Sequence, residues 1–443
     1  MFAKTFKGGV HPHDCKRLSE NARIVRLEAK GELTYLMNQH IGAPAKPLVK
    51  PGDRVLLGQI IAEAGGFVSA GVAASVSGTV KTVTLKMTQS GDEAMAITVV
   101  NDNEYEAVPG FGEPRDYAKM SKDEIRAAIR DAGIVGMGGA GFPTAVKVTV
   151  KDDSKIDYII CNGAECEPYI TCDYRLMLER PDDAVTGMKI LLRLFENAVG
   201  VFGIENNKPE GIKSVASACA GSEKISVMPL KKKYPQGGER MLISAVTGRK
   251  INSKKLPADA GCVVVNYSTL IAIAEAVTRQ MPLVRRVVTV TGDAINEPSN
   301  FDVPIGISAA ELIEAAGGYK TEPEKLIFGG PMMGAAVYTA DLPITKTASC
   351  VLALTKDETA GLEPTECIRC GKCLYACPEH LMPIRLKDTA DARDYAGFEA
   401  AHGLECIGCG CCTYVCPARR RLSQTITMAK RYVLAEKKKG AAK

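Results

Sequence analysis

The sequence predicts a multidomain α/β protein, and three observations support this prediction. The chain has 443 residues, which corresponds to about three domains at roughly 150 residues each. Strand-like and helix-like segments alternate between about residues 120 and 281, as in a mostly parallel sheet covered by helices. Two cysteine runs of identical spacing follow near the C-terminal end. With 46% hydrophobic and 24% charged residues, the composition is that of a folded protein.

Residues 1–110 begin poorly patterned and continue as short apolar strands between glycine and proline turns. This pattern resembles the half-barrel of lipoyl- and biotinyl-carrier domains. Those carriers need a lysine at the hairpin tip, whereas the tip here is Gly65-Gly66 and no lysine lies between Lys50 and Lys81. We therefore expect a lipoyl-like half-barrel that serves as a structural module.

Residues 120–282 contain the strand–helix alternation. Ser121 and Glu124 have the spacing of a capping box, which predicts a helix that stops at Gly133. The further elements expected are a strand over 157–161, a helix over 182–197, a strand over 199–204, a helix over 208–219 and a strand over 224–228. This order predicts an α/β domain with a mostly parallel sheet.

The pattern shortens after residue 282. Residues 283–345 combine short strands with one helix, which predicts a small β-grasp-like module. A polar linker over 355–365 leads into a cysteine-rich domain over 357–421. The remaining residues, 422–443, form a basic tail that we expect to be helical over 422–436.

Nine of the 16 cysteines lie between Cys367 and Cys416. They form the run Cys-x2-Cys-x2-Cys-x3-Cys-Pro twice, the spacing of bacterial two-cluster ferredoxins, in which the fourth cysteine ligates the other cluster. Zinc sites usually come as CxxC pairs with a longer loop between them, so the spacing predicts two [4Fe-4S] clusters. The expected ligands are Cys367, Cys370, Cys373 and Cys416 for cluster one, and Cys406, Cys409, Cys412 and Cys377 for cluster two. Cys411 has no place in the pattern.

A glycine-dense segment, 136–144, follows the first helix of the α/β region. Glycines let the backbone approach a phosphate or a flat ring where a Cβ would collide, so the segment alone indicates either a ligand loop or a tight turn. The letters GMGGAGFPTAVK resemble the glycine loop of the flavin-carrying, NADH-oxidising subunit of respiratory complex I and of related hydrogenase and formate dehydrogenase subunits. Three further segments resemble that family in the same order: 162–168, 234–239 and 266–269.

The complete chain is similar to one family in particular. A GGVHP opening, a lysine-less half-barrel, the flavin domain, a grasp module and a double ferredoxin motif resemble the RnfC family of the Rnf complex over essentially all of residues 1–420. That family oxidises reduced ferredoxin, reduces NAD+ and couples this to Na+ or H+ pumping by membrane partners. The resemblance implies a complex-I-type FMN/NADH domain, an SLBB-like grasp module, non-covalent FMN, NAD(H) and two [4Fe-4S] clusters. It also implies a peripheral place on the cytoplasmic face of the cell membrane, beside the other Rnf-type subunits, with ferredoxin bound directly or through one of them.

The same resemblance implies roles for residues of the α/β domain. Glu167 is expected near the nicotinamide and is the candidate catalytic residue. Phe142 would contact adenine, and Lys147 would neutralise phosphate. The residues expected to hold FMN or the dinucleotide are Gly138, Gly139, Gly141, Phe142, Lys147, Asn162, Glu165, Gly237, Glu239, Asn266 and Thr269.

Two other functions fit these motifs. One is a soluble NADH-dependent cobalamin reductase of a diol-utilisation microcompartment, which resembles the same family closely. The other is a non-catalytic electron-wiring adaptor whose α/β domain has lost its ligands. A flavin has a clear chemical role in the Rnf-type subunit and in the cobalamin reductase. The reason is that nicotinamide exchanges hydride pairs, a cubane exchanges single electrons and a flavin exchanges both.

The net charge of +5 is a property of the tail. Residues 418–443 carry +8, which leaves −3 for the rest of the chain, so we do not expect a nucleic-acid binder. Such a tail is either a solvated helix or a contact to anionic lipid or a membrane partner. No apolar run reaches the roughly 18 residues of a membrane span, and the first residues contain no apolar signal core. We therefore expect neither a membrane span nor export.

Overall fold

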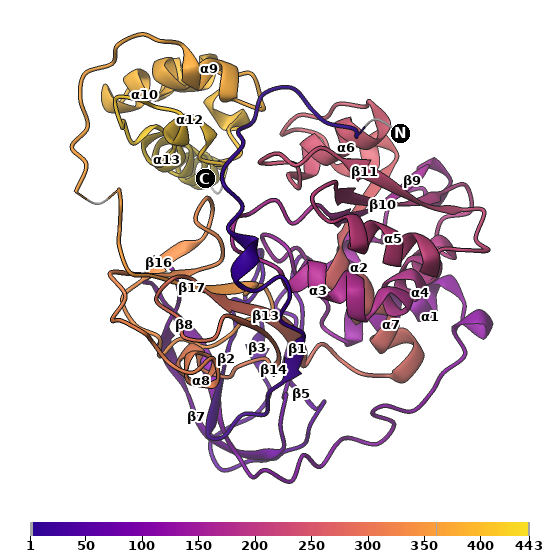
Figure 1. Cartoon of the computed structure of the whole chain (residues 1–443). Helices are drawn as coiled ribbons and strands as arrows, with labels where there is room; N and C mark the ends of the chain where they lie inside the picture. The colour runs from indigo at the N-terminus through magenta and orange to yellow at the C-terminus, as the bar shows by residue number, and fades with distance from the viewer. Residues whose placement is uncertain (1–2, 360, 442–443) are drawn as a thin grey trace.

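The computed structural model describes residues 3–359 and 361–441 and contains four β-sheets in this part of the chain. In Figure 1 the cysteine-rich domain (orange to yellow) lies at the top left and the α/β domain (magenta) on the right, and the half-barrel (purple) lies at the bottom beside the module that follows the α/β domain (orange). Within the described residues, no helix combines the length and the hydropathy needed to cross a membrane.

The half-barrel consists of two antiparallel sheets, with strand orders β2-β8-β7-β4 and β3-β5-β6. Its strands are β2 (Glu32–Leu36), β3 (Lys46–Pro47), β4 (Arg54–Val55), β5 (Ile60–Glu63), β6 (Val72–Ala73), β7 (Gly78–Met87) and β8 (Glu93–Asn101). Alternate residues of a strand face opposite sides of a sheet, and Leu33 and Tyr35 of β2 point into the core. This core is continuous with that of the neighbouring six-stranded sheet.

The α/β domain contains a parallel sheet of order β11-β10-β9-β12. The strands are β9 (Tyr158–Gly163), β10 (Val199–Glu205), β11 (Ile225–Leu230) and β12 (Cys262–Asn266). The helices are α1 (Lys122–Asp131), α2 (Thr144–Lys147), α3 (Cys172–Glu179), α4 (Pro181–Leu192), α5 (Pro209–Ala218), α6 (Glu239–Thr247) and α7 (Tyr267–Arg279). The predicted elements are confirmed to within a few residues, and the predicted capping box at Ser121 begins α1.

Both faces of the parallel sheet are covered, which explains why its strands are almost continuously apolar. Ile159 of β9 and Phe202 of β10 face α4 and α7 in the main core. Ile160 of β9 faces the opposite side and packs against Leu242 of α6. The strands β10 and β12 lie on opposite sides of β9, so the winding of the sheet reverses between β9 and β12.

The module after the α/β domain is a six-stranded sheet of order β1-β14-β13-β17-β15-β16, covered by α8. Its elements are β1 (Ile24–Arg26), β13 (Arg285–Thr291), β14 (Ser299–Pro304), α8 (Ala309–Ala315), β15 (Lys325–Phe328), β16 (Ala335–Val337) and β17 (Cys350–Leu354). The edge strand β1 comes from the poorly patterned start of the chain and pairs in parallel with β14. A three-residue strand without alternating hydrophobicity gave no signal in the sequence.

The described part of the cysteine-rich domain is built from four short α-helices and one long C-terminal helix. They are α9 (Lys372–Ala376), α10 (Pro383–Asp391), α11 (Tyr395–Ala400), α12 (Cys411–Tyr414) and α13 (Leu422–Ala441). The predicted helical tail is therefore confirmed, and it extends beyond residue 436. Ile426 and Val433 of α13 pack against Leu386 and Phe398, so this helix forms part of the domain's own core.

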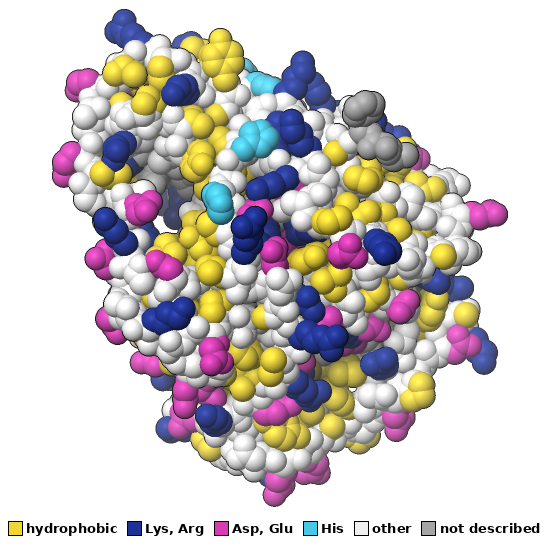
Figure 2. Space-filling view, in the orientation of Figure 1, with side chains coloured by type: hydrophobic (Ala, Val, Ile, Leu, Met, Phe, Trp, Pro, Cys, Tyr) yellow, Lys and Arg dark blue, Asp and Glu magenta, His cyan; other side chains and the backbone are white. Residues whose placement is uncertain are grey.

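The N-terminal segment joins the α/β domain to the cysteine-rich domain. In Figure 1 it runs (indigo) between the two, and Figure 2 shows Lys and Arg side chains (dark blue) and His side chains (cyan) along its path. Gly9 N donates to Ala376 O (2.9 Å), and Val10 exchanges two backbone hydrogen bonds with Tyr234. Lys232 fastens the same segment through Asp14, at 2.8 Å.

Candidate functional site: a glycine loop at the sheet crevice and two cysteine cages

The residues predicted to hold FMN gather at the carboxyl ends of β9 and β12. Asn162 near the end of β9 and Asn266 at the end of β12 are register partners across the sheet. The winding of the sheet reverses at this point, and open α/β sheets bind their ligands in the crevice outside such a reversal. The fold therefore places both asparagines where a cofactor is expected.

The glycine loop, residues 136–142, lies over this crevice. Its base is closed by a hydrogen bond from Gly136 N to Phe142 O (2.9 Å). Its first turn is attached to α7, because Met137 N donates to the hydroxyl of Thr269 (3.0 Å). Thr269, which the sequence assigned to cofactor binding, is itself buried and holds the loop from below. Phe142 is half-buried at the base.

The glycines of this loop face different surroundings. A Cβ at Gly138 would lie 2.5 Å from Asn266 Nδ2, so a larger residue would push the loop off the sheet. Gly141 has a φ of +69°, in the left-handed region that favours glycine. Gly139 is exposed, and a Cβ there would meet no atom within 4 Å. The outer side of the loop is thus bare backbone facing open space, which fits a flat ring or a phosphate.

Asn266 is fixed by a partner that the sequence analysis missed. Its Nδ2 donates to Asp173 Oδ2 (2.7 Å), while its Oδ1 accepts from Thr269 N (3.3 Å) and caps α7. Ser268 donates to the other oxygen of Asp173 (2.5 Å). Asp173 is buried and lies in the first turn of α3. Acidic residues are common there because they interact favourably with the helix dipole, so nothing in the sequence distinguished Asp173 as part of the site.

Lys147 and Glu239 form an ion pair at the rim of the site. Lys147 Nζ lies 3.1 Å from Glu239 Oε1 and donates to Val264 O (2.9 Å). The two side chains are 25% and 41% exposed, so the pair opens to solvent. Glu239 is also the first residue of α6, whose free N–H groups favour an anion. The structure therefore brings together two residues that were predicted separately for cofactor binding.

Asn162 connects two of the predicted segments. Its Nδ2 donates to Gly237 O (2.8 Å), and Gly237 N donates in turn to Cys166 Sγ (3.4 Å). A Cβ at Gly237 would lie 3.2 Å from Asn162 Oδ1, a tighter contact than most side chains make. The loop after β9 and the segment 234–239 are thereby held as one wall of the crevice.

Glu165 is placed outside this group. Its side chain is 3% exposed, and Oε1 accepts from the backbone N–H groups of Asp173 (2.7 Å) and Tyr174 (3.2 Å). Burial raises the pKa of this carboxyl, and the nearby Lys16 and Lys208 oppose the rise. Both of these donors belong to the N-terminus of α3, and Oε2 pairs with Lys16 (3.5 Å), so in this structure the carboxyl caps a helix.

Glu167 lies where the α/β domain meets the loop 329–334 between β15 and β16. Its Oε2 accepts from Met332 N (3.1 Å), and its buried Oε1 has no hydrogen-bond partner among the described residues. A Cβ at Gly330 would collide with this carboxyl, so the loop approaches it closely. Burial raises the pKa of Glu167 to about 7. A carboxyl in this range can hold or release a proton near neutral pH.

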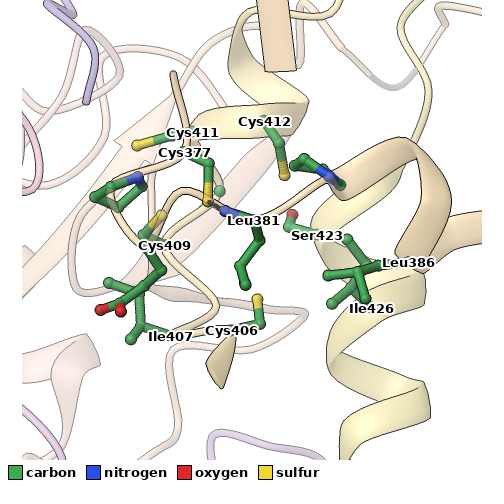
Figure 3. A pocket seen from close by; sticks show the side chains of 14 residues that line it. Cys377, Leu381, Leu386, Cys406, Ile407, Cys409, Cys411, Cys412, Ser423 and Ile426 are labelled. Atoms are coloured by element: carbon green, nitrogen blue, oxygen red, sulfur yellow. Dashed lines mark hydrogen bonds between the residues drawn. The ribbon is translucent and has the colours of Figure 1, made fainter. Parts of the chain in front are cut away.

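The second cysteine run forms a cage together with one member of the first. Figure 3 shows the side chains of Cys377, Cys406, Cys409 and Cys412 around one space, with Cys411 directed away from it. The cavity measures about 380 Å³ including its open side. Leu381 N donates to Cys377 Sγ (3.3 Å) and Gly408 N to Cys406 Sγ (3.4 Å). Such backbone donors stabilise a cluster-bound thiolate, so the donor set fits a cubane and the expected crossover of Cys377.

The first cysteine run is more open. Cys370 is exposed, and Cys367 accepts a hydrogen bond from Arg369 N (3.4 Å). Burial raises the pKa of the Cys373 thiol, and the nearby Cys416 adds to the rise. For the first run, the exchange of fourth cysteines, with Cys416 as the fourth ligand, stays a prediction from the spacing.

The fold and these two kinds of site define an iron–sulfur flavoprotein. Known family models match the chain in the same order as its modules. They are the RnfC barrel sandwich hybrid domain at residues 4–104, the Nuo51 FMN-binding domain at 129–275, the SLBB domain at 287–336 and the 4Fe-4S dicluster domain at 366–419. The matches indicate FMN and two [4Fe-4S] clusters as cofactors.

Similar proteins define the family. A subunit of the proton-translocating ferredoxin:NAD(+) oxidoreductase complex of Clostridium ljungdahlii is 45% identical over 86% of this chain and 84% of its own length. The corresponding subunit of the Na(+)-translocating complex of Acetobacterium woodii is 41% identical over 98% of both chains. That of the ion-translocating oxidoreductase complex of Rhodobacter capsulatus is 39% identical over 89% of this chain and 76% of its own length. The chain belongs to the RnfC family.

A solved structure shares the fold at lower similarity. A chain of an NAD+-reducing [NiFe]-hydrogenase in the H2-reduced state matches 72% of this chain and 62% of its own length, with a TM-score of 0.50 and 20% identity. At this identity the likeness concerns the fold alone.

Proposed function

We propose that this chain is the NAD(H)-oxidoreductase subunit of a membrane-bound Rnf-type complex. It passes electrons between ferredoxin and NAD+ through FMN and two [4Fe-4S] clusters, and partner subunits couple the reaction to Na+ or H+ translocation. The observation on which this proposal rests is the bare backbone of the glycine loop over the β9–β12 crevice, in a domain whose segment 234–240 contacts one cysteine cage. The related subunits of known ion-translocating complexes support the same function.

The residues around the crevice are proposed to bind the cofactors in distinct ways. The flavin supplies the exchange between hydride pairs and single electrons when it is bound. Gly138, Gly139 and Gly141 provide its floor, and Lys147 provides a positive charge for phosphate. The polar walls come from Asn162, Gly237, Glu239, Asn266 and Thr269.

Three acidic or aromatic residues are proposed to contact the cofactors. Glu167, with one buried oxygen unpaired among the described residues, is proposed to orient the nicotinamide amide. Phe142 is proposed to contact adenine. The proposed flavin contact of Glu165 requires the carboxyl to leave the N-terminus of α3, where it now accepts two hydrogen bonds.

In the proposed complex this chain is a peripheral subunit, bound on the cytoplasmic face of the membrane. Its partners there are the other Rnf-type subunits, and ferredoxin docks directly or through one of them. Relatives described as subunits of translocating complexes support this placement. The basic end of α13 is the candidate contact to anionic lipid.

A substitution at Gly139 tests the flavin site. The structure leaves space for a side chain at Gly139, so Gly139→Leu is expected to fold normally and yet to lose most of the FMN, because the leucine occupies the position of the ring. Gly31→Leu is the matched control. A Cβ at Gly31 would also meet no atom within 4 Å, and Gly31 belongs to the half-barrel region, away from the crevice. Equal FMN content in wild type and Gly139→Leu would contradict the site.

Anaerobic purification tests the complete proposal. We expect about eight iron atoms and eight sulfides per chain, one FMN, and bleaching of the flavin absorbance by NADH. Zinc in place of iron, or a bound flavin that NADH fails to bleach, would overturn it.

A further inference from the structure

The segment 234–240 contacts both the flavin crevice and the cage of cluster two. Its middle residue, Gly237, accepts from Asn162 and donates to Cys166, as described above. Its first residue, Tyr234, and its last, Arg240, reach the cysteine-rich domain instead. One stretch of seven residues therefore fixes the position of cluster two relative to the flavin.

Tyr234 makes the most buried of these contacts. It is 1% exposed, and its hydroxyl donates to the backbone carbonyl of Cys409 (2.9 Å). Its own carbonyl accepts from Val10 N (2.8 Å) and lies 3.9 Å from the thiol of Cys411.

Arg240 holds the other end of the segment. Its guanidinium lies 3.1 Å from Glu379 and 2.9 Å from Glu405, and all three side chains are less than a quarter exposed. Glu379 follows Cys377 by two residues, and Glu405 directly precedes Cys406. Arg240 is thus attached to both ends of the cage, while Tyr234 is attached to Cys409 between them.

We propose that Tyr234 is a positioning residue for cluster two: its hydroxyl holds the Cys409 carbonyl in place and raises the reduction potential of this cluster. The physical reason is that a carbonyl oxygen points negative charge at its surroundings, and a donated hydrogen bond reduces that charge. Hydrogen bonds and burial around the ligands are the means by which proteins adjust cluster potentials. Loss of the hydroxyl would leave Cys409 O buried without this donor and make cluster two a weaker acceptor.

This inference depends on the proposed function, because it requires both clusters and the flavin. The test variant is Tyr234→Phe, which removes one oxygen atom and keeps the ring. Tyr35→Phe is the matched control: Tyr35 is also fully buried, and its hydroxyl is hydrogen-bonded to Ser75 (2.8 Å), but it lies in the half-barrel. Iron, sulfide and flavin are measured first, so that a failure of the proposed function is distinguished from a failure of this inference.

Redox titration followed by EPR then measures the two cluster potentials. In Tyr234→Phe we expect one of the two potentials to become more negative and the other to stay, with NADH-driven reduction of that cluster slower by about tenfold. Tyr35→Phe is expected to leave both potentials unchanged. Unchanged potentials in a fully loaded Tyr234→Phe protein would overturn the inference.

A second variant covers the case in which Tyr234→Phe fails to fold or loses iron. Site-specific 3-fluorotyrosine at position 234 keeps the shape of the side chain and makes its hydroxyl a stronger donor. The potential of the same cluster should then become more positive. A potential equal to that of the wild type would contradict the proposed role of the hydroxyl.

Discussion

The two cysteine runs have the same spacing but lie in different surroundings. In the first run Cys370 is exposed, and the neighbouring Ile368 and Tyr375 are 66% and 80% exposed. In the second run Cys409 and the spare Cys411 are buried against Tyr234. The spacing thus sets the ligand chemistry, which is the same twice, while neighbouring modules determine which cage faces the flavin domain and which faces outward.

Removing one ligand from each run should produce the largest difference. Cys370→Ala and Cys409→Ala are each expected to lower iron from about eight to about four atoms per chain. In Cys370→Ala the remaining cluster is cluster two, which stays beside the flavin domain, so NADH should still reduce it. In Cys409→Ala the remaining cluster is cluster one, and its reduction by NADH should be slower by roughly 100-fold or more. Stopped-flow absorbance measures this, and the reverse pattern would break the comparison.

Glu167 should make the surroundings of the second run sensitive to pH. Its carboxyl holds Met332 N, and Met332 lies next to Gly410 in the second run. Because burial raises the pKa of Glu167 to about 7, the folded state binds this proton more tightly than the unfolded state. The contribution to stability is complete below about pH 4.5 and is lost as pH rises through 7, by up to about 3 kcal/mol.

Glu167→Gln removes that dependence. The melting temperature of the variant relative to wild type should therefore rise between pH 5 and pH 8. Glu104→Gln, at a side chain that is 67% exposed, is the control and should show no such trend. A constant difference between Glu167→Gln and wild type across this range would contradict the buried position of the carboxyl.

Arg240 should contribute more to stability than an exposed arginine of the same domain. Arg240→Gln breaks two partly buried ion pairs beside the second run and is expected to cost about 2 kcal/mol. Arg249→Gln breaks a pair with Asp157 whose side chains are 40% and 46% exposed, so its expected cost is below about 1 kcal/mol. Thermal release of iron measures both, and equal effects would show that the contact with the cage is unimportant.

The basic end of α13 should have the smallest effect on the fold. Lys437, Lys438 and Lys439 follow Val433, the last residue of the helix in the core of the domain, and Lys437 forms an ion pair with Glu399 of α11 at the surface. Replacing all three with glutamine should change stability by less than about 0.5 kcal/mol but should weaken binding to vesicles that contain anionic lipid. Unchanged vesicle binding would leave α13 with a purely structural role.

Much of the α/β domain could be predicted because its signals are local. The apolar strand over 157–161, the Ser121 capping box and the cysteine spacings each depend on a few neighbouring residues. The family resemblance placed Asn162, Gly138 and Asn266 in one site, and the structure brings these three together. The agreement arises because the pairing of β9 with β12 and the close contact of Gly138 with Asn266 belong to the fold itself, which related proteins share.

The remainder depends on contacts between distant parts of the chain. Glu165 caps α3, and Glu205 is buried with Lys208 at 3.4 Å. Glu165 follows β9 and Glu205 is the last residue of β10, so each lies at a strand end where an acidic residue could equally face a ligand. Asp173 orients Asn266 from 93 residues away. No pattern within one segment distinguishes an acidic residue that orients a ligand residue from one that caps a helix, because the difference lies in how the helices pack.

The close approach of Gly8 and Gly9 to the cysteine-rich domain has a consequence for biogenesis. A Cβ at Gly8 would lie 2.7 Å from the carbonyl of Cys377, and one at Gly9 would lie 2.6 Å from that of Tyr234. Ribosomes release the cysteine-rich residues roughly 360 positions after these glycines, and domains made earlier fold first. The segment can therefore pair with Tyr234 once the α/β domain has folded, whereas the contacts of Gly8 with Cys377 and of Gly9 with Ala376 can form only after the cysteine-rich domain has been made.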